Sequence, residues 1–395
     1  MKILEINKFF YARRGAELHF LDVTLLLEKS GHDVAVFSMQ HPENKVSKWE
    51  QYFVSHCGYN TYDSTLWERM IGTGRLFWSF EARRKLRILL DEFHPDIVHV
   101  HNAYHQLSLS FFPLIKKAGI PFIMTVHDYA MISPDKDMYS PEIGKQYWKF
   151  LRVKKYGFGK RLLLVLKKYW EDAWDFYDNI DRFIVPSRFV ESILLSAGIP
   201  KEKIVILPHF ISESESDVMP ATDAALPEKY LFSFGAISKE KGIETLLHIA
   251  KSLDIPLVLA GRIESGFDPS EHPQVIYLGM RKKSELNSLI SPASVVISAS
   301  TLPETFGLTA LETIALGKPF FGLDRGALSE IIENGANGFL AHDEAELQKN
   351  ISRFLSREVI LKDTATIQSN AYEKFGETVY LRKFQAVYTS LTRNG

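Results

Sequence analysis

Short apolar runs alternate with longer amphipathic stretches from the start of the chain. The amphipathic stretches at 17–32 and 107–118 repeat apolar residues with helical spacing, and the first of them stops at a glycine. Strands joined by helices in this order build a parallel, doubly wound sheet. The strands expected in this part of the chain are 2–7, 33–39, 96–102, 122–128 and 182–187.

The same alternation restarts after residue 205. Between the two parts lies 212–228, which is acidic, rich in small residues and carries two prolines, so we expect a surface linker there. The fold class is therefore α/β, with two Rossmann-like domains at 1–207 and 208–370, each able to bind ligands at the carboxyl ends of its strands. The strands expected in the second part are 230–235, 257–261, 275–279, 294–300 and 319–324.

Composition excludes several classes of protein. The formal net charge of −1 over 395 residues gives no general preference for nucleic acid, and the single cysteine excludes a disulfide framework. We find no secretory signal and no apolar run long enough to span a bilayer, so we expect a cytoplasmic protein.

The stretch TLPETFG (301–307) joins an expected strand to an expected helix. The amides of Gly307, Leu308 and Thr309 would begin that helix at the end of a strand, where backbone N–H groups bind phosphate. Glu304 and Glu312 are themselves anions, so they suit the hydroxyl groups of sugars on either side of the phosphate. Together these residues indicate a nucleotide-sugar site. The alternative is that Glu304 only starts a helix and Glu312 faces solvent.

The segment 302–340 resembles the signature of the retaining glycosyltransferases of family 4. That family has the GT-B fold, in which two Rossmann-like domains face each other across a cleft and a C-terminal helix, here 371–395, crosses back to the first domain. The resemblance implies that Glu304 contacts the donor sugar near its reacting carbon and that Glu312 binds the ribose. The amides of Gly307, Leu308 and Thr309 are implied to hold the diphosphate, and Thr305 and Phe306 are implied to belong to the same donor-binding site.

The segment 232–250 also resembles the family, in which a lysine at the start of a helix binds the diphosphate. Lys241 occupies that position. The family arginine at the end of the preceding strand is absent, because Ala236 stands there. Arg262, at the end of the next strand, or Arg14 is a candidate to supply the missing positive charge.

In the first domain, 119–134 resembles the family segment that places a histidine against the donor sugar and the reaction centre, here His127. In 9–23, Gly15 corresponds to the second glycine of the family's Gly-Gly loop. His99 and His101 would share one face of a strand, which raises a metal site as an alternative. No cysteine or carboxylate accompanies them at a ligand spacing, so we expect no metal.

The resemblance implies a hexosyltransferase that takes a nucleotide-diphosphate sugar as donor and uses no metal or other cofactor. The acceptor would be a hydroxyl of a glycan or a lipid-linked molecule, in cell-surface polysaccharide or glycolipid synthesis. Two alternatives remain: a catalytically impaired nucleotide-sugar-binding protein, or another GT-B enzyme such as a sugar-nucleotide epimerase.

Two stretches, 144–170 and 75–87, combine Lys and Arg with aromatic residues. Such composition suits the anionic inner face of a cell membrane, which predicts peripheral docking. The alternative is an ordinary basic surface whose aromatic residues pack inward. No nucleic-acid-binding module accompanies the charge, so we expect no nucleic-acid partner.

Overall fold

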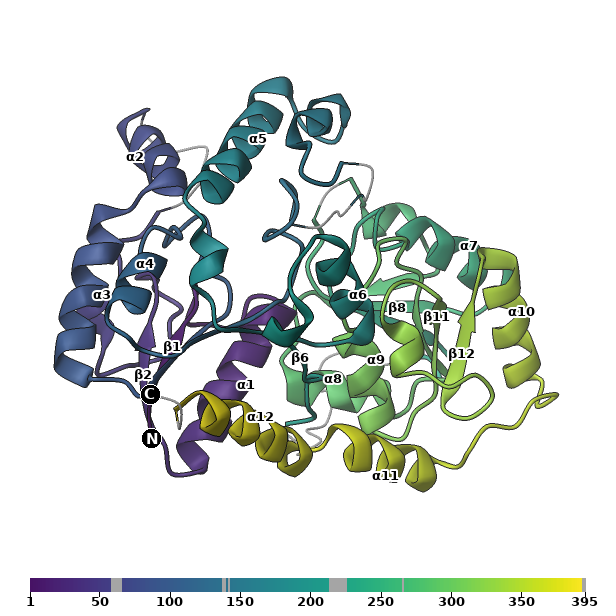
Figure 1. Cartoon of the computed structure of the whole chain (residues 1–395). Helices are drawn as coiled ribbons and strands as arrows, with labels where there is room; N and C mark the ends of the chain where they lie inside the picture. Colours follow the sequence, from purple (N-terminus) through teal and green to yellow (C-terminus); the bar gives the residue numbers. More distant parts are fainter. Residues whose placement is uncertain (58–65, 137–139, 141–142, 213–225, 265, 393–395) are drawn as a thin grey trace. The chain divides into compact units, whose positions relative to one another are not determined.

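The computed structural model describes residues 1–57, 66–136, 140, 143–212, 226–264 and 266–392, and most of the expected linker at 212–228 lies outside them. The chain forms two compact units (Figure 1). The main division falls between Leu207 and Pro208, and the chain enters the first unit again at Leu381 rather than at residue 371. The first unit comprises Met1–Pro186, Val190–Leu207 and Leu381–Gly395, and the second comprises Ser187–Phe189 and Pro208–Tyr380.

The first unit contains a six-stranded parallel sheet in the order β2-β1-β3-β4-β5-β6. Its inner strands are apolar and buried, as expected for a sheet with helices on both faces. The strands are β1 (Lys2–Ile6), β2 (Asp33–Phe37), β3 (Ile97–Val100), β4 (Phe122–Thr125), β5 (Arg182–Val185) and β6 (Ile204–Ile206). The helices are α1 (Gly15–Lys29), α2 (Leu66–Phe77), α3 (Phe80–Phe93), α4 (Phe112–Lys117), α5 (Phe158–Ala173), most of α6 (Arg188–Ser196) and most of α12 (Glu377–Thr392).

One expected helix of this unit is shorter than its apolar pattern. We expected helix over 107–118, but α4 begins at Phe112. Ser108 has a left-handed backbone with φ of 68°, which a helix does not tolerate, and Pro113 is favourable only in a first turn. The residues before Phe112 therefore form a loop at the carboxyl end of β3.

The second unit contains another six-stranded parallel sheet, in the order β12-β11-β10-β7-β8-β9. The strand order reverses between β7 and β10, which is the position where doubly wound sheets bind ligands. The strands are β7 (Leu231–Phe234), β8 (Leu257–Ala260), β9 (Val275–Tyr277), β10 (Val295–Ser298), β11 (Phe320–Leu323) and β12 (Gly338–Ala341). The helices are α7 (Ile243–Leu253), α8 (Lys283–Ile290), α9 (Leu308–Ala315), α10 (Glu344–Leu355) and α11 (Thr364–Phe375).

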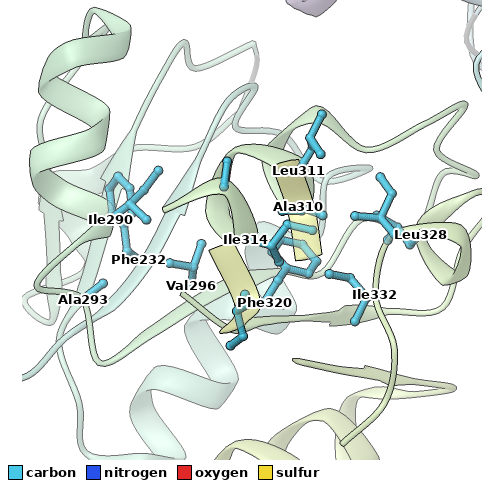
Figure 2. Packing of buried hydrophobic residues seen from close by; sticks show 14 of the residues in the cluster. Phe232, Ile290, Ala293, Val296, Ala310, Leu311, Ile314, Phe320, Leu328 and Ile332 are labelled. Atoms are coloured by element: carbon cyan, nitrogen blue, oxygen red, sulfur yellow. The ribbon is translucent and has the colours of Figure 1, made fainter. Parts of the chain in front are cut away.

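Helix α9 is fixed by the core of the second unit. Ala310, Leu311 and Ile314 lie on its buried face, at helical spacing, and each is at most 1% exposed. They belong to one apolar cluster with Phe320 of β11 and Leu328 (Figure 2). This packing holds the first turn of α9 at the carboxyl end of β10.

Candidate active site

The turn before α9 requires a glycine. Gly307 adopts φ of 107° at the N-cap, and a Cβ atom there would lie 2.5 Å from Cδ2 of the buried Leu328. The helix then begins at Leu308, so the amides of Leu308 and Thr309 belong to its first turn. Amides in a first turn have no acceptor within the helix and favour an anion.

Glu304 is held by its backbone and presents its side chain at the edge of the sheet. Its amide donates to Arg325 O at 3.3 Å, and its carbonyl accepts from the amide of Ala327 at 2.9 Å. Its Oε1 accepts from Lys241 Nζ at 2.6 Å, with the two side chains 25% and 34% exposed. The carboxylate and the ammonium are therefore fixed and also accessible to a ligand.

The position of Lys241 depends on Gly242, the glycine that follows it. Gly242 has φ of 79°, and a Cβ atom there would lie 1.9 Å from Ala299 O, so the start of α7 packs directly on the end of β10. At the end of β7, a Cβ on Gly235 would lie 3.8 Å from the Thr309 methyl group. Glu304, Lys241 and the first turn of α9 therefore meet where the strand order reverses.

The other residues expected at this site contribute less. The Phe306 side chain is 2% exposed and packs against the rings of His209 and Phe375, so only its backbone can reach a ligand. Thr305 O accepts from Ser187 Oγ at 2.7 Å. Glu312 is half-buried on α9, whereas the Arg262 side chain is exposed at the end of β8.

In the first unit, Gly15 begins α1 without a left-handed backbone, so no backbone strain requires a glycine there. Arg14 is the N-cap residue and is exposed. His127 follows β4 and is half-buried, and its Nε2 lies 2.9 Å from Nδ1 of His101. The alternation of side chains along β3 does place His99 and His101 on one face, as expected.

Both of these histidines bind the buried carboxylate of Glu5 on the neighbouring strand β1. His99 Nδ1 lies 3.0 Å from Glu5 Oε1, and His101 Nε2 lies 3.0 Å from Glu5 Oε2. Burial opposes ionisation of Glu5, but the charge of His99 and the hydrogen bonds from both rings lower its pKa to about 2. Burial, together with the charge of His99, lowers the pKa of His101 to about 4.

The Glu5, His99 and His101 atoms lie close enough together to ligate a metal. Sequence reasoning overlooked Glu5 as the acidic partner, because it belongs to a strand far away in the chain. The three side chains are completely buried, and hydrogen bonds to Glu5 pair one nitrogen of each ring. The cluster is thus satisfied as a hydrogen-bonded network.

A second group of buried polar residues was not expected from the sequence. It lies at the carboxyl ends of β1, β3 and β4, where Lys8 Nζ sits 4.9 Å from the centre of the Tyr104 ring. Burial lowers the pKa of Lys8 and raises the pKa of both Glu17 and Asp128. Buried groups with opposed charge and shifted pKa values are typical of functional sites. The only sequence signal was that Lys8, Tyr104 and Asp128 come shortly after strands, whereas Glu17 lies on α1.

The structure changes the interpretation of the two basic stretches. Lys167 and Lys168 are buried and pair with Glu171 and Asp172, and in 75–87 Arg75 pairs with Glu81. These charges are therefore not available to a membrane. The exposed side of α5 instead carries a row of large apolar residues at helical spacing. They are Phe158 (60% exposed), Leu162 (37%), Leu166 (51%) and Tyr169 (40%).

Comparison with known proteins settles the family. The sequence profile of Glycosyltransferase Family 4 matches residues 13–215, and that of Glycosyl transferases group 1 matches 216–374. The chain belongs to glycosyltransferase family 4. Nearly all of this family 4 chain is covered by the two profiles, so the resemblance expected from 302–340 is confirmed.

Two curated relatives of this family 4 chain come from Streptococcus pneumoniae. Alpha-galactosylglucosyldiacylglycerol synthase is 24% identical over 54% of this chain, and the match covers 61% of its own length. Alpha-monoglucosyldiacylglycerol synthase is 26% identical over 90% of this chain and 78% of its own length.

Among solved structures, Anabaena HepE in complex with UDP and glucose superposes with a TM-score of 0.66. The sequences are 16% identical, and the superposition covers 99% of this chain and 100% of that one. The fold is therefore GT-B, as expected. No helix in the described residues combines the length and the apolar character that crossing a bilayer requires.

Proposed function

We propose that this family 4 protein is a retaining glycosyltransferase that moves a hexose from a nucleotide-diphosphate sugar to a hydroxyl of a glycan or lipid-linked acceptor. The observation that carries the proposal is the meeting of Lys241, Glu304 and the first turn of α9 at the switch point of the second sheet. The solved structure of HepE, which has the same fold, contains UDP and glucose.

Each group at the switch point has a role in donor chemistry. The amides of Leu308 and Thr309 and the Lys241 ammonium stabilise the diphosphate, which gains negative charge as the glycosidic bond breaks. Glu304 accepts hydrogen bonds from the hexose and stabilises the positive charge that develops at its reacting carbon. The leaving phosphate helps to deprotonate the acceptor on the same face of the sugar, which retains the anomeric configuration. These groups neutralise the diphosphate without a metal.

The buried cluster of Lys8, Glu17, Tyr104 and Asp128 is our candidate for acceptor binding in the first unit. Lys8 and Glu17 are buried and Asp128 is half-buried, so the cluster offers charged groups with little water around them, which suits hydrogen bonding to hydroxyls. The two synthases from Streptococcus pneumoniae are named for glycosyldiacylglycerols. Among the possible acceptors, we therefore favour a glycolipid.

Donor binding and turnover test the proposal together. We expect a uridine, guanosine or adenosine diphosphate sugar to raise the melting temperature of the protein. When a lipid extract is added, the enzyme should release the nucleoside diphosphate and transfer the sugar with its anomeric configuration retained. Lys241→Ala should weaken binding by at least tenfold. Lys239→Ala is the matched control, since Lys239 is 78% exposed on the same loop and pairs with Glu244.

The outcomes separate the alternatives. Binding without loss of donor would favour the impaired sugar-nucleotide-binding protein, and conversion of the donor to an epimer would favour the epimerase. Failure of every nucleotide sugar to bind, or equal effects of the two lysine substitutions, would contradict the proposed site.

For the membrane, we propose that α5 docks on the anionic inner face of the cell membrane through Phe158, Leu162, Leu166 and Tyr169. Exposed apolar side chains in a row on a helix enter the boundary between headgroups and acyl chains. Each basic residue near the surface adds ~1 kcal/mol of attraction to anionic lipid. Exposed basic residues of the same stretch, Lys154 and Lys160 among them, supply that attraction.

Flotation with liposomes tests this docking. The protein should float with vesicles containing phosphatidylglycerol, less with phosphatidylcholine alone, and less at high salt. The double variant Phe158→Ser/Leu166→Ser should bind at least tenfold more weakly. Leu195→Ser, which removes an apolar side chain that is 40% exposed on α6, is the control. Unchanged flotation of the double variant would exclude α5 as the contact.

A further inference from the structure

The second unit contains a cavity of about 610 Å³ at the amino ends of β10 and β11. It is formed by the starts of these strands, the end of α10 and the loop that leads to α11. Because the sheet is parallel, the cavity lies at the opposite end of the strands from Lys241 and Glu304. Small-molecule ligands usually occupy cavities of roughly 300–1,000 Å³.

The apolar lining of this cavity combines core and surface side chains. Val295, Val296 and Ile367 are at most 2% exposed, whereas Ile360 is 85% exposed. Figure 2 shows Val296 within the apolar cluster of this unit. Phe354, near the end of α10, also lines the cavity. An apolar chain that enters it would therefore leave water for contacts with the core.

Three cationic side chains line the same cavity, namely Lys318, Arg357 and Lys362. Its one carboxylate, Asp363, accepts from the amide of Thr366 at 3.0 Å and from Thr366 Oγ1 at 2.6 Å in the first turn of α11. Within the part of the chain that the structure describes, none of the three cations forms an ion pair. The lining therefore carries two net positive charges.

Two of these cations occupy positions that are unfavourable for folding. Lys318 is half-buried, and its Nζ donates only to Ala293 O, at 3.4 Å, while burial lowers the pKa of this ammonium. Arg357 has a left-handed backbone with φ of 62° directly after the C-cap of α10, where glycine is the usual residue. Cations at such positions suit a negatively charged ligand that offsets these costs.

We propose that this cavity binds a phosphate monoester with an apolar chain, its phosphate among Lys318, Arg357 and Lys362. A phosphate monoester carries about 1.5 to 2 negative charges near neutral pH, which matches two net positive charges better than one carboxylate does. The apolar lining receives the chain. This binding is independent of the proposed function, because the cavity and the donor site lie at opposite ends of the sheet.

Isothermal titration calorimetry of the full-length protein at pH 7.5 tests the ligand class, with decyl phosphate below its micelle concentration as the probe. We expect saturable binding. Decanoate should bind at least tenfold more weakly, and neither inorganic phosphate nor decyltrimethylammonium should compete at equal concentration. Absence of saturable binding would overturn the proposal. Equal binding of decanoate would refute the phosphate group, and competition by either of the other two compounds would show that the charge or the chain acts alone.

Substitutions place the ligand in the cavity. Arg357→Gly relieves the left-handed backbone, so the melting temperature should stay the same or rise while the Kd for decyl phosphate increases at least tenfold. Lys318→Met keeps the apolar stem, removes the half-buried charge and should have the same two effects. Lys349→Met, which removes an exposed lysine of α10 outside the cavity, is the matched control and should change Kd less than twofold.

Lys241→Ala tests whether decyl phosphate binds at the donor site instead. We expect its Kd to stay within twofold of wild type, whether or not nucleotide sugars bind the protein. Loss of decyl phosphate binding in Lys241→Ala, or wild-type Kd values in both Arg357→Gly and Lys318→Met, would refute the site.

Discussion

Replacing Gly242 by alanine should disturb the site through packing alone. The added Cβ would lie 1.9 Å from Ala299 O, whereas ordinary contacts begin at 3.4 Å, so α7 and β10 must separate by about 1.5 Å. A movement of that size would carry the Lys241–Glu304 contact, now 2.6 Å, out of ion-pair range. The left-handed backbone adds a further ~1–2 kcal/mol, and overpacking adds ~1–3 kcal/mol.

Gly335 provides a control with almost the same backbone. Its φ is 78° against 79° for Gly242, but a Cβ there would meet nothing within 4 Å. Gly335→Ala should therefore lose only the backbone contribution of ~1–2 kcal/mol. The difference between the two variants isolates the contact with Ala299.

Urea unfolding at 25 °C, followed by far-UV circular dichroism, measures both variants. All six tryptophans lie in the first unit, so fluorescence reports that unit separately and should keep its midpoint. Gly242→Ala should also bind nucleoside diphosphate more weakly than Gly335→Ala. Equal losses of stability and affinity in the two variants would refute the reasoning, because the close approach to Ala299 would then have no energetic consequence.

Three further predictions follow from the described side chains. If Arg262 supplies the cation absent at position 236, then Arg262→Ala lowers donor turnover at least tenfold, or ~1.4 kcal/mol, in an assay of released nucleoside diphosphate; a change within twofold would exclude it. As pH falls from 6.5 to 4, the free energy of unfolding of the first unit should decrease by up to ~1.4 kcal/mol per pH unit, because a histidine in the unfolded chain binds a proton that the buried His101, with its lowered pKa, does not. Urea titrations followed by fluorescence should show this slope, and His101→Asn should reduce it. Lys167→Met removes the nearer of the two lysines that pair with the buried Glu171 and leaves only Lys168, 3.9 Å away, so it should lower the free energy of unfolding by up to ~3–5 kcal/mol; the exposed Lys154→Met should leave it unchanged, and equal effects would contradict the pairing.

The sequence carried enough information to place the turn before α9 and every strand except β6 and β12, which were not expected. Each strand is a short apolar run, and the pattern around Gly307 is local, so both can be recognised without knowing which segments are neighbours. The expected division near residue 207 rested on the same local signal. The links between Glu5, His101 and His127 could not be found this way, because they depend on the register of three strands that are far apart in sequence.

The basic stretches illustrate a second kind of limit. Lys167 and Lys168 were expected to be surface charges, because the stretch 144–170 contains no acidic residue that could pair with them. Glu171 and Asp172 follow immediately, and each lies four residues after one of these lysines, which is the spacing of ion pairs within a helix. Helical spacing alone could have predicted these pairs. The burial of Lys167, Lys168 and Glu171 could not have been predicted, since it depends on tertiary packing.

The return of the chain to the first unit at Leu381 has a consequence for biosynthesis. Tyr388 lies against the carboxylate of Glu5 and the ring of His99, although 383 and 289 residues separate them in the chain. The ribosome makes this segment only after the whole of the second unit. Until the second unit has been translated, the newly made first unit therefore lacks the segment that carries Tyr388, and one side of its histidine network is not covered.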